Sequence, residues 1–166
     1  MKHKFKIAFM KTAYTFSELS SATKLQVGAV VVKDDRIISL GYNGTPTGWD
    51  NCCEDTIYPN GDPKDFIYDV NFPYCDDDDR PYALKTKPEV IHAEMNALMK
   101  LASSSESGKG ASIFITHAPC IDCAKGIYQT GITEVYYREQ YRSTVGIDFL
   151  QQCGITVEKL YIDVPF

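Results

Sequence analysis

The spacing of apolar residues predicts a helix followed by a β-hairpin in the first quarter of the chain. Three apolar residues recur at helical spacing near the N-terminus: Ile7, Met10 and Tyr14. They predict a helix over roughly residues 4–20. The stretch VGAVVVK, residues 27–33, is rich in β-branched side chains and predicts a strand. A two-residue turn at 34–35 and the stretch RIISLGY, residues 36–42, complete the hairpin.

The second half of the chain alternates between helical and strand patterns. Apolar residues recur at helical spacing after Pro88: Ile91, Met95, Leu98 and Ala102. The predicted elements that follow are strand 111–116, helix 120–130, strand 132–137, helix 144–152 and strand 155–160. Strand–helix–strand units form parallel pairs with right-handed crossovers. Together with the antiparallel hairpin, they predict an α/β fold: a three-layer α/β/α sandwich around a mixed five-stranded sheet.

Residues 50–88 show neither the helical nor the strand periodicity of apolar residues. Their acidic run, Asp76–Asp79, is typical of a solvated loop. Six aromatic residues indicate that much of the segment packs as a flap and is not a free loop: Tyr58, Phe66, Tyr68, Phe72, Tyr74 and Tyr82. A connection of this length is usually functional or disordered. We therefore expect a single domain over residues 1–166 with an irregular insertion, or flap, at about 50–88.

Composition narrows the class of protein. Apolar residues make up 44% of the 166 positions and charged residues 23%, which is ordinary for a globular domain. The net charge of −5 argues against a broad basic surface for nucleic acid. No apolar run is long enough to span a membrane, and the N-terminus lacks the pattern of a signal peptide. Four cysteines are predicted to be free thiols in a reducing compartment, the cytoplasm: Cys52, Cys53, Cys75 and Cys153.

The candidate chemistry lies in two short motifs, His92-Ala93-Glu94 and Pro119-Cys120-Ile121-Asp122-Cys123. One histidine and two cysteines suit a catalytic zinc, because three protein ligands leave the fourth tetrahedral position open. Glu94 then remains as a proton carrier. A redox pair or a structural zinc site would also explain the cysteines alone, but neither requires the carboxylate.

Helix geometry restricts where such a metal would lie. His92 and Glu94 are about 200° apart around a helix, so both reach one ion only if the helix begins beside them. Cys120 and Cys123 share one face of a helical turn, and Pro119 suits a helix start. We therefore expect two helix N-termini to point at one site, where they would stabilise thiolates.

The H-x-E and P-C-x-x-C pair is the signature of zinc-dependent deaminases. Three stretches resemble the cytidine deaminase-like superfamily, and within it the deoxycytidylate (dCMP) deaminases: VGAVVVKDDRIISLGYNGTPTG, IHAEMNAL and APCIDCAKGIYQTGITEVYY. The resemblance leaves residues 50–88 largely unmatched. The G-Y-N-G-x-P loop is the main reason to favour dCMP over other substrates.

The resemblance implies a cytidine deaminase-like fold and roles for particular residues. His92, Cys120 and Cys123 would bind Zn²⁺, and Glu94 would move protons while dCMP is hydrolysed to dUMP and ammonia. The expected substrate-binding residues are Asn43, at the sugar 3′-hydroxyl, Ala93 and Tyr141. The expected regulatory-nucleotide residues are Gly41, Tyr42, Asn43 and Gly44.

Regulation and assembly are also implied by the resemblance. Many such enzymes are hexamers that dCTP activates with Mg²⁺ and dTTP inhibits. Some phage members hold a second, structural zinc through a cysteine near the first strand. Here Ala22 and Thr23 occupy that region, so we expect no second zinc. A site formed by Cys52 or Cys53 with Cys75 is the remaining alternative.

Several assignments stay open at the level of sequence. The 5′-phosphate needs positive charge or N–H groups, and the candidates are Lys24, Arg138, Arg142 and the Tyr141 hydroxyl. His117 is expected at the pocket edge or on the surface. The rival functions are a deaminase of cytosine, cytidine or tRNA adenosine, and a non-catalytic zinc module that senses nucleotides.

Overall fold

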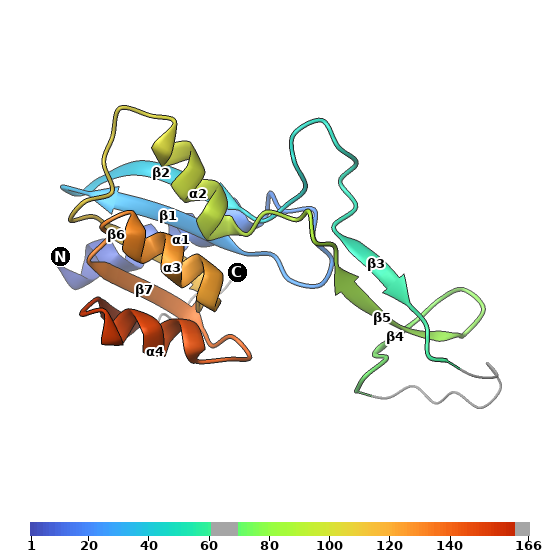
Figure 1. Ribbon diagram of the computed structural model, residues 1–166. Coiled ribbons are helices and arrows are strands. Elements are labelled where there is room, and N and C mark those ends of the chain that lie inside the picture. Colours follow the sequence, from blue (N-terminus) through green and yellow to red (C-terminus); the bar gives the residue numbers. More distant parts are fainter. Residues whose placement is uncertain (61–69, 162–166) are drawn as a thin grey trace.

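The structure is a computed structural model, and it describes residues 1–60 and 70–161 (Figure 1). Its helices are α1 (His3–Ser17), α2 (Ala93–Ala102), α3 (Ile121–Gln129) and α4 (Val145–Gln152). Its strands are β1 (Gly28–Lys33), β2 (Arg36–Tyr42), β3 (Glu54–Ile57), β4 (Tyr74–Cys75), β5 (Pro81–Thr86), β6 (Ser112–His117), β7 (Glu134–Glu139) and β8 (Thr156–Lys159). None of the helices in these ranges is long and apolar enough to cross a membrane.

The predicted mixed five-stranded sheet is confirmed, with strand order β2-β1-β6-β7-β8. β1 is antiparallel to both β2 and β6, whereas β6, β7 and β8 are parallel. Asp34 and Asp35 form the predicted turn of the first hairpin, and both have positive φ, 51° and 57°. Such φ values match the right-handed twist of the two strands. The element boundaries differ from the predicted ones by at most three residues.

Alternating residues of the sheet feed two separate cores, which confirms the three-layer arrangement (Figure 1). Val30 and Phe114 face α1, where they pack with Phe9, Met10 and Ala13. Val31, Ile113 and Ile115 face the other side and pack with residues of α2, α3 and α4. Because the central strands are buried on both faces, they appear as continuous apolar runs in the sequence.

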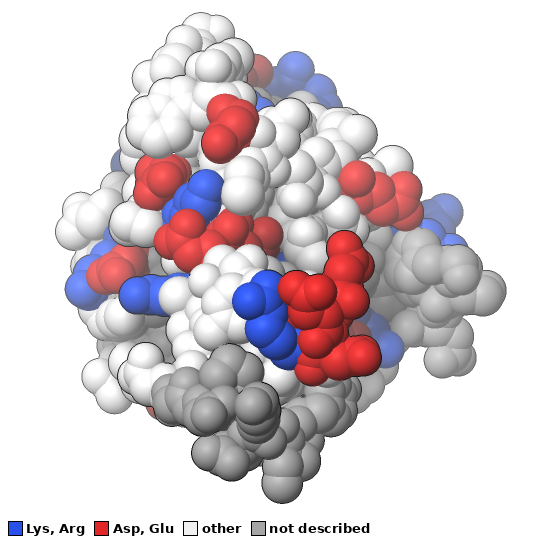
Figure 2. Space-filling view, turned by 90° about the vertical axis from the view of Figure 1, so that its right-hand side faces the viewer, with Lys and Arg blue, Asp and Glu red and all other residues white. Residues whose placement is uncertain are grey.

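The described parts of the expected irregular insertion contain strands between residues 54 and 57 and between residues 74 and 86. β3, β5 and β4 form a second, antiparallel sheet in that order, which projects from one end of the main sheet (Figure 1). β3 and β4 are short, and β3 is exposed along most of its length, so these two strands leave no alternating apolar signal. Seen from this end, acidic side chains gather with basic ones beside them (Figure 2).

Aromatic contacts hold the small sheet together, as the sequence predicted. The Tyr74 and Tyr82 rings are stacked with centroids 5.3 Å apart, and Tyr58 lies 6.2 Å from Tyr82. Such pairs contribute beyond the area that they bury. Two of the six aromatic residues named above, Phe66 and Tyr68, lie outside the described residues.

Candidate active site

The structure brings the three predicted zinc ligands together. The Nδ1 atom of His92 lies 3.6 Å from the Cys120 sulfur and 3.4 Å from the Cys123 sulfur. Tetrahedral zinc with bonds of normal length would separate such nitrogen and sulfur atoms by roughly 3.6 Å. The donor set and its spacing therefore fit a zinc ion with three protein ligands.

Two helix starts position these side chains, as the spacing predicted. His92 directly precedes α2 and Cys120 directly precedes α3, and both have extended backbone conformations. Cys123 lies in the first turn of α3 and is buried. The positive ends of two helix dipoles therefore point at the ligand group, which favours negative charge there.

The ligand side chains also influence one another's protonation. A hydrogen bond from the Cys123 thiol, and a second one with His92, lower the pKa of Cys120 to about 4. His92 and Cys123 each form a hydrogen bond with Cys120. These hydrogen bonds raise the pKa of His92 and the pKa of Cys123. Cys120 is thus a thiolate at neutral pH, which is the form that binds metals.

Glu94 lies beside this group but is not one of its ligands. It is the second residue of α2, and its side chain is buried. Burial raises the pKa of Glu94 to about 7. A carboxyl group with a pKa near neutrality can both accept and release a proton at working pH, as general acid–base chemistry requires.

A cavity opens onto these residues, and several distant segments of the chain line it. Six predicted site residues line it: Asn43, His92, Ala93, Glu94, Cys120 and Tyr141. The remaining lining residues are Leu25, Val27, Glu54, Thr86, Val90, His117 and Ala118. His117 is thus at the pocket edge, as expected. Glu54 and Thr86 come from the small sheet, and sequence reasoning missed them because their strands have no apolar period.

The loop at 41–44 holds two parts of the site in place. The Asn43 side-chain oxygen accepts a hydrogen bond from Val27 N at 2.8 Å, and its Nδ2 donates to Leu25 O at 2.9 Å. Gly44 exchanges two main-chain hydrogen bonds with Ile91, the residue before His92. A β-carbon at Gly41 would lie 2.3 Å from Ala93 O, so only glycine lets β2 approach α2 so closely.

The candidate phosphate-binding residues are dispersed. Only Tyr141 lines the cavity. Lys24 donates through Nζ to Leu84 O at 3.0 Å, and Arg138 pairs with Glu139 at 3.0 Å. None of the three cationic candidates, Lys24, Arg138 and Arg142, lines the cavity.

The other cysteines do not assemble into a comparable group. All six are free, and within residues 1–60 and 70–161 a single group of three potential ligands forms, the one around His92. Ala22, Cys53 and Val90 pack together as a small buried apolar cluster.

Known proteins share both the motifs and the architecture. Residues 3–139 match the family model described as cytidine and deoxycytidylate deaminase zinc-binding region. The deoxycytidylate deaminase of Enterobacteria phage T4 is 36% identical, with 89% of this chain and 86% of that protein covered. ComE operon protein 2 of Bacillus subtilis (strain 168) is 33% identical, with 93% and 70% covered.

A solved structure extends the match to the whole fold. The dCMP deaminase of cyanophage S-TIM5, crystallised in complex with dCMP and dUMP, superposes with a TM-score of 0.77 at 45% identity. The alignment covers 96% of this chain and 99% of that one. The chain therefore belongs to the family of the cytidine and deoxycytidylate deaminase zinc-binding region.

Proposed function

We propose that this protein is a zinc-dependent deoxycytidylate deaminase that hydrolyses dCMP to dUMP and ammonia. The observation on which this rests is a three-ligand zinc group with a buried carboxylate beside it that is not a ligand. A purely structural zinc site would have no use for Glu94. The 45% identity to a dCMP deaminase that was crystallised with dCMP and dUMP supports the choice of substrate.

The residues divide the chemistry between them. Zinc held by His92, Cys120 and Cys123 would lower the pKa of a bound water toward neutrality. Glu94 would accept one proton of the attacking water and donate it to N3 of the pyrimidine, as the water oxygen bonds to C4. Glu94 would then take the remaining proton from the new C4 hydroxyl and deliver it to the exocyclic amino group, so that the C4–N bond breaks and ammonia and dUMP are released. Its pKa of about 7 suits both directions of transfer.

The proposed substrate-binding residues surround this centre. Ala93 is the first residue of α2, so its main-chain N–H has no partner within the helix and is available to a ligand. Asn43 and Tyr141 line the same cavity. Since Asn43 already bonds to the 25–27 segment through both ends of its amide, it would contact the sugar from a fixed position.

Ammonia release discriminates among the candidate functions. The zinc-loaded protein would be incubated separately with dCMP, dCTP, cytidine, cytosine and an RNA stem. We expect dCMP to be the preferred substrate. Faster release from another substrate would identify a different deaminase, and no release from any of them would favour a nucleotide-binding module without catalysis.

We infer further that dCTP with Mg²⁺ activates this enzyme, that dTTP inhibits it, and that it is a hexamer in the cytoplasm. The contact between Gly44 and Ile91 supports a regulatory role for residues 41–44, because it links the loop to the zinc ligand His92. The free cysteines support a reducing compartment. Rates at low dCMP with each effector, and light scattering for the mass, test these points. Unchanged rates with both effectors would exclude the regulation.

A further inference from the structure

The cavity has an unusual balance of charge for a site that takes a nucleotide. Its lining in the described part of the chain contains no lysine or arginine, and it contains two carboxylates, Glu54 and Glu94. The 5′-phosphate of dCMP must nevertheless meet N–H or O–H donors. Donors on uncharged side chains therefore have to provide much of that contact. This inference rests on the proposed function.

His117 is the donor that is best placed by the fold. It is the last residue of β6 and follows Ile113 and Ile115 on the face of the sheet that packs against α2 and α3. Its side chain is half-buried and lines the cavity. Ala118 N donates to Glu139 O at 2.9 Å, which ties the end of β6 to that of β7, two residues before Tyr141.

The Thr116 hydroxyl lies beside Nδ1 of the His117 ring, where it can donate a hydrogen bond to that nitrogen. The Thr116 side chain is fully buried, and its oxygen accepts a hydrogen bond from Gly28 N at 3.1 Å. The single hydroxyl proton then needs an acceptor, and His117 Nδ1 lies 3.1 Å away. With Nδ1 as the acceptor, the neutral ring carries its proton on Nε2. Burial lowers the pKa of His117, which favours this neutral form.

We propose that His117 is a specificity residue that donates its Nε2–H to the 5′-phosphate of the nucleotide, beside the Tyr141 hydroxyl. The base end of the site is already taken by the zinc group and Glu94 at the starts of α2 and α3. His117 ends β6, and Tyr141 follows the end of the parallel strand β7 by two residues, so both lie where open α/β sheets bind ligands. A neutral donor also avoids attracting either carboxylate into an ion pair that would compete with substrate.

Binding of the product tests this assignment without relying on turnover. The zinc-loaded parent and variants would be titrated calorimetrically with dUMP and with deoxyuridine, which lacks the phosphate. His117→Phe removes both ring nitrogens, whereas His117→Gln keeps an N–H donor at similar reach. We expect His117→Phe to weaken dUMP binding by about 10- to 100-fold, as for loss of a hydrogen bond to a charged group, and His117→Gln to recover most of it.

The controls separate this role from a structural one. Affinity for deoxyuridine and zinc content should be unchanged in both variants, and His3→Phe, at the exposed start of α1, should behave like the parent. Equal weakening for dUMP and deoxyuridine, or no weakening, would overturn the proposal. A nitrogen-15 spectrum that places the His117 proton on Nδ1 would also overturn it.

The two proposals fail in different ways. A parent that binds dUMP no more tightly than deoxyuridine would refute the phosphate contact. A parent that binds dUMP in a His117-dependent way but releases no ammonia from dCMP would refute only the proposed reaction.

Discussion

At the scale of single residues, the site depends on the order of three neighbours. His92 precedes α2, Ala93 begins it and Glu94 follows, so the zinc ligand, the proposed N–H donor and the proposed proton carrier all lie at one helix start. The same arrangement inside a helix would spread the three side chains around its axis. The position of the helix start is therefore as important to the chemistry as the residue types.

Replacing Glu94 with glutamine should separate metal binding from catalysis. The amide keeps the shape of the carboxyl but cannot exchange protons, so we expect bound zinc at the parental level and dCMP turnover reduced by at least about 10²- to 10⁴-fold. Elemental analysis and ammonia release measure the two effects. Cys120→Ser is the matched comparison, because it should lose the metal as well. Parental turnover in a zinc-loaded Glu94→Gln variant would exclude the proposed proton route.

Gly146 is a second residue on which the metal site should depend. A β-carbon there would lie 2.2 Å from Pro119 O and 2.9 Å from the Cys120 main-chain carbon. Gly146→Ala must therefore displace the segment that presents Cys120, and we expect a loss of about 1–3 kcal/mol in folding free energy and weaker zinc retention. Urea denaturation and zinc competition measure both. Gln151→Ala, on an exposed part of α4, should change neither.

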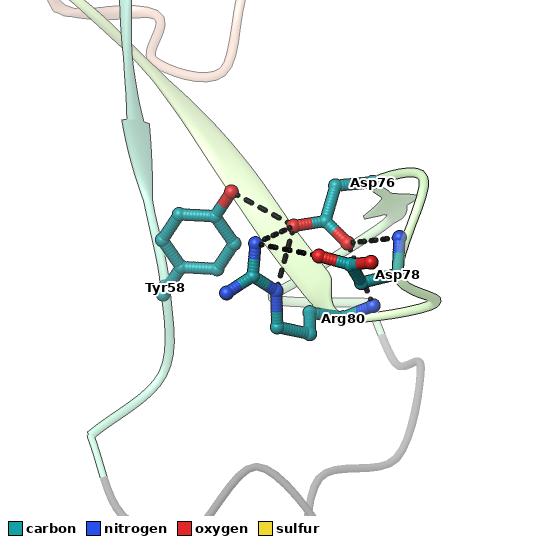
Figure 3. A network of polar contacts seen from close by, with 4 residues as sticks. All are labelled: Tyr58, Asp76, Asp78 and Arg80. Atoms are coloured by element: carbon teal, nitrogen blue, oxygen red, sulfur yellow. Dashed lines mark hydrogen bonds and ion pairs between the residues drawn. The ribbon is translucent and has the colours of Figure 1, made fainter.

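At the scale of elements, the small sheet is stabilised by a polar network at its turn (Figure 3). The Asp76 carboxylate accepts hydrogen bonds from Arg80 N, from the Arg80 guanidinium and from the Tyr58 hydroxyl. It also accepts one from Asp78 N at 3.0 Å. Tyr58 follows β3, whereas Asp76 and Arg80 flank the β4–β5 turn, so one carboxylate joins both edges of the sheet.

This network predicts that the small sheet responds to acid. Partial burial alone would raise the pKa of Asp76, but hydrogen bonds from Arg80, Tyr58 and Asp78 outweigh it and lower the pKa to about 2. Because the folded pKa is below the ordinary value of 3.8, the network stabilises the sheet above about pH 4. The stabilisation should be lost as the pH falls from about 4 through 2.

Hydrogen exchange of the β4–β5 turn measures that loss. The Arg80 amide should be protected near neutral pH and should lose protection over this range in the parent. Asp76→Asn should be poorly protected throughout, whereas Asp77→Asn should match the parent, because the network is formed by Tyr58, Asp76, Asp78 and Arg80. Equal protection in the parent and Asp76→Asn would show that the carboxylate does not hold the turn.

At the scale of the whole molecule, the metal site connects two helices of the core, α2 and α3. Its ligands come from the starts of α2 and α3, which both pack on one face of the main sheet. Cavity residues come in addition from the small sheet, from the loop after β2 and from the end of β7. The fold thus gathers these distant segments of the chain around one metal site.

Removal of zinc should therefore lower the stability of the whole domain. A ligand that binds only the folded state stabilises it by mass action, so a strong chelator should lower the melting temperature by several degrees. Differential scanning calorimetry before and after chelation, with zinc added back, measures the change. Cys120→Ser should respond to neither treatment. Removal of zinc from the parent without a shift would show that the metal is not coupled to folding.

The sequence alone determined the main sheet, the helix layers and the identity of the zinc ligands. β1 and β6 are buried on both faces and appear as continuous apolar runs, and the helices show apolar residues at helical spacing, so those elements could be predicted. The H-x-E and P-C-x-x-C motifs identified the zinc ligands, because side chains at these spacings can reach one ion from two helix starts. Only the tertiary structure showed the small sheet and the contribution of Glu54 and Thr86 to the cavity. Those strands are held by cross-strand hydrogen bonds and by aromatic contacts between distant residues, and such contacts leave no local pattern in the sequence.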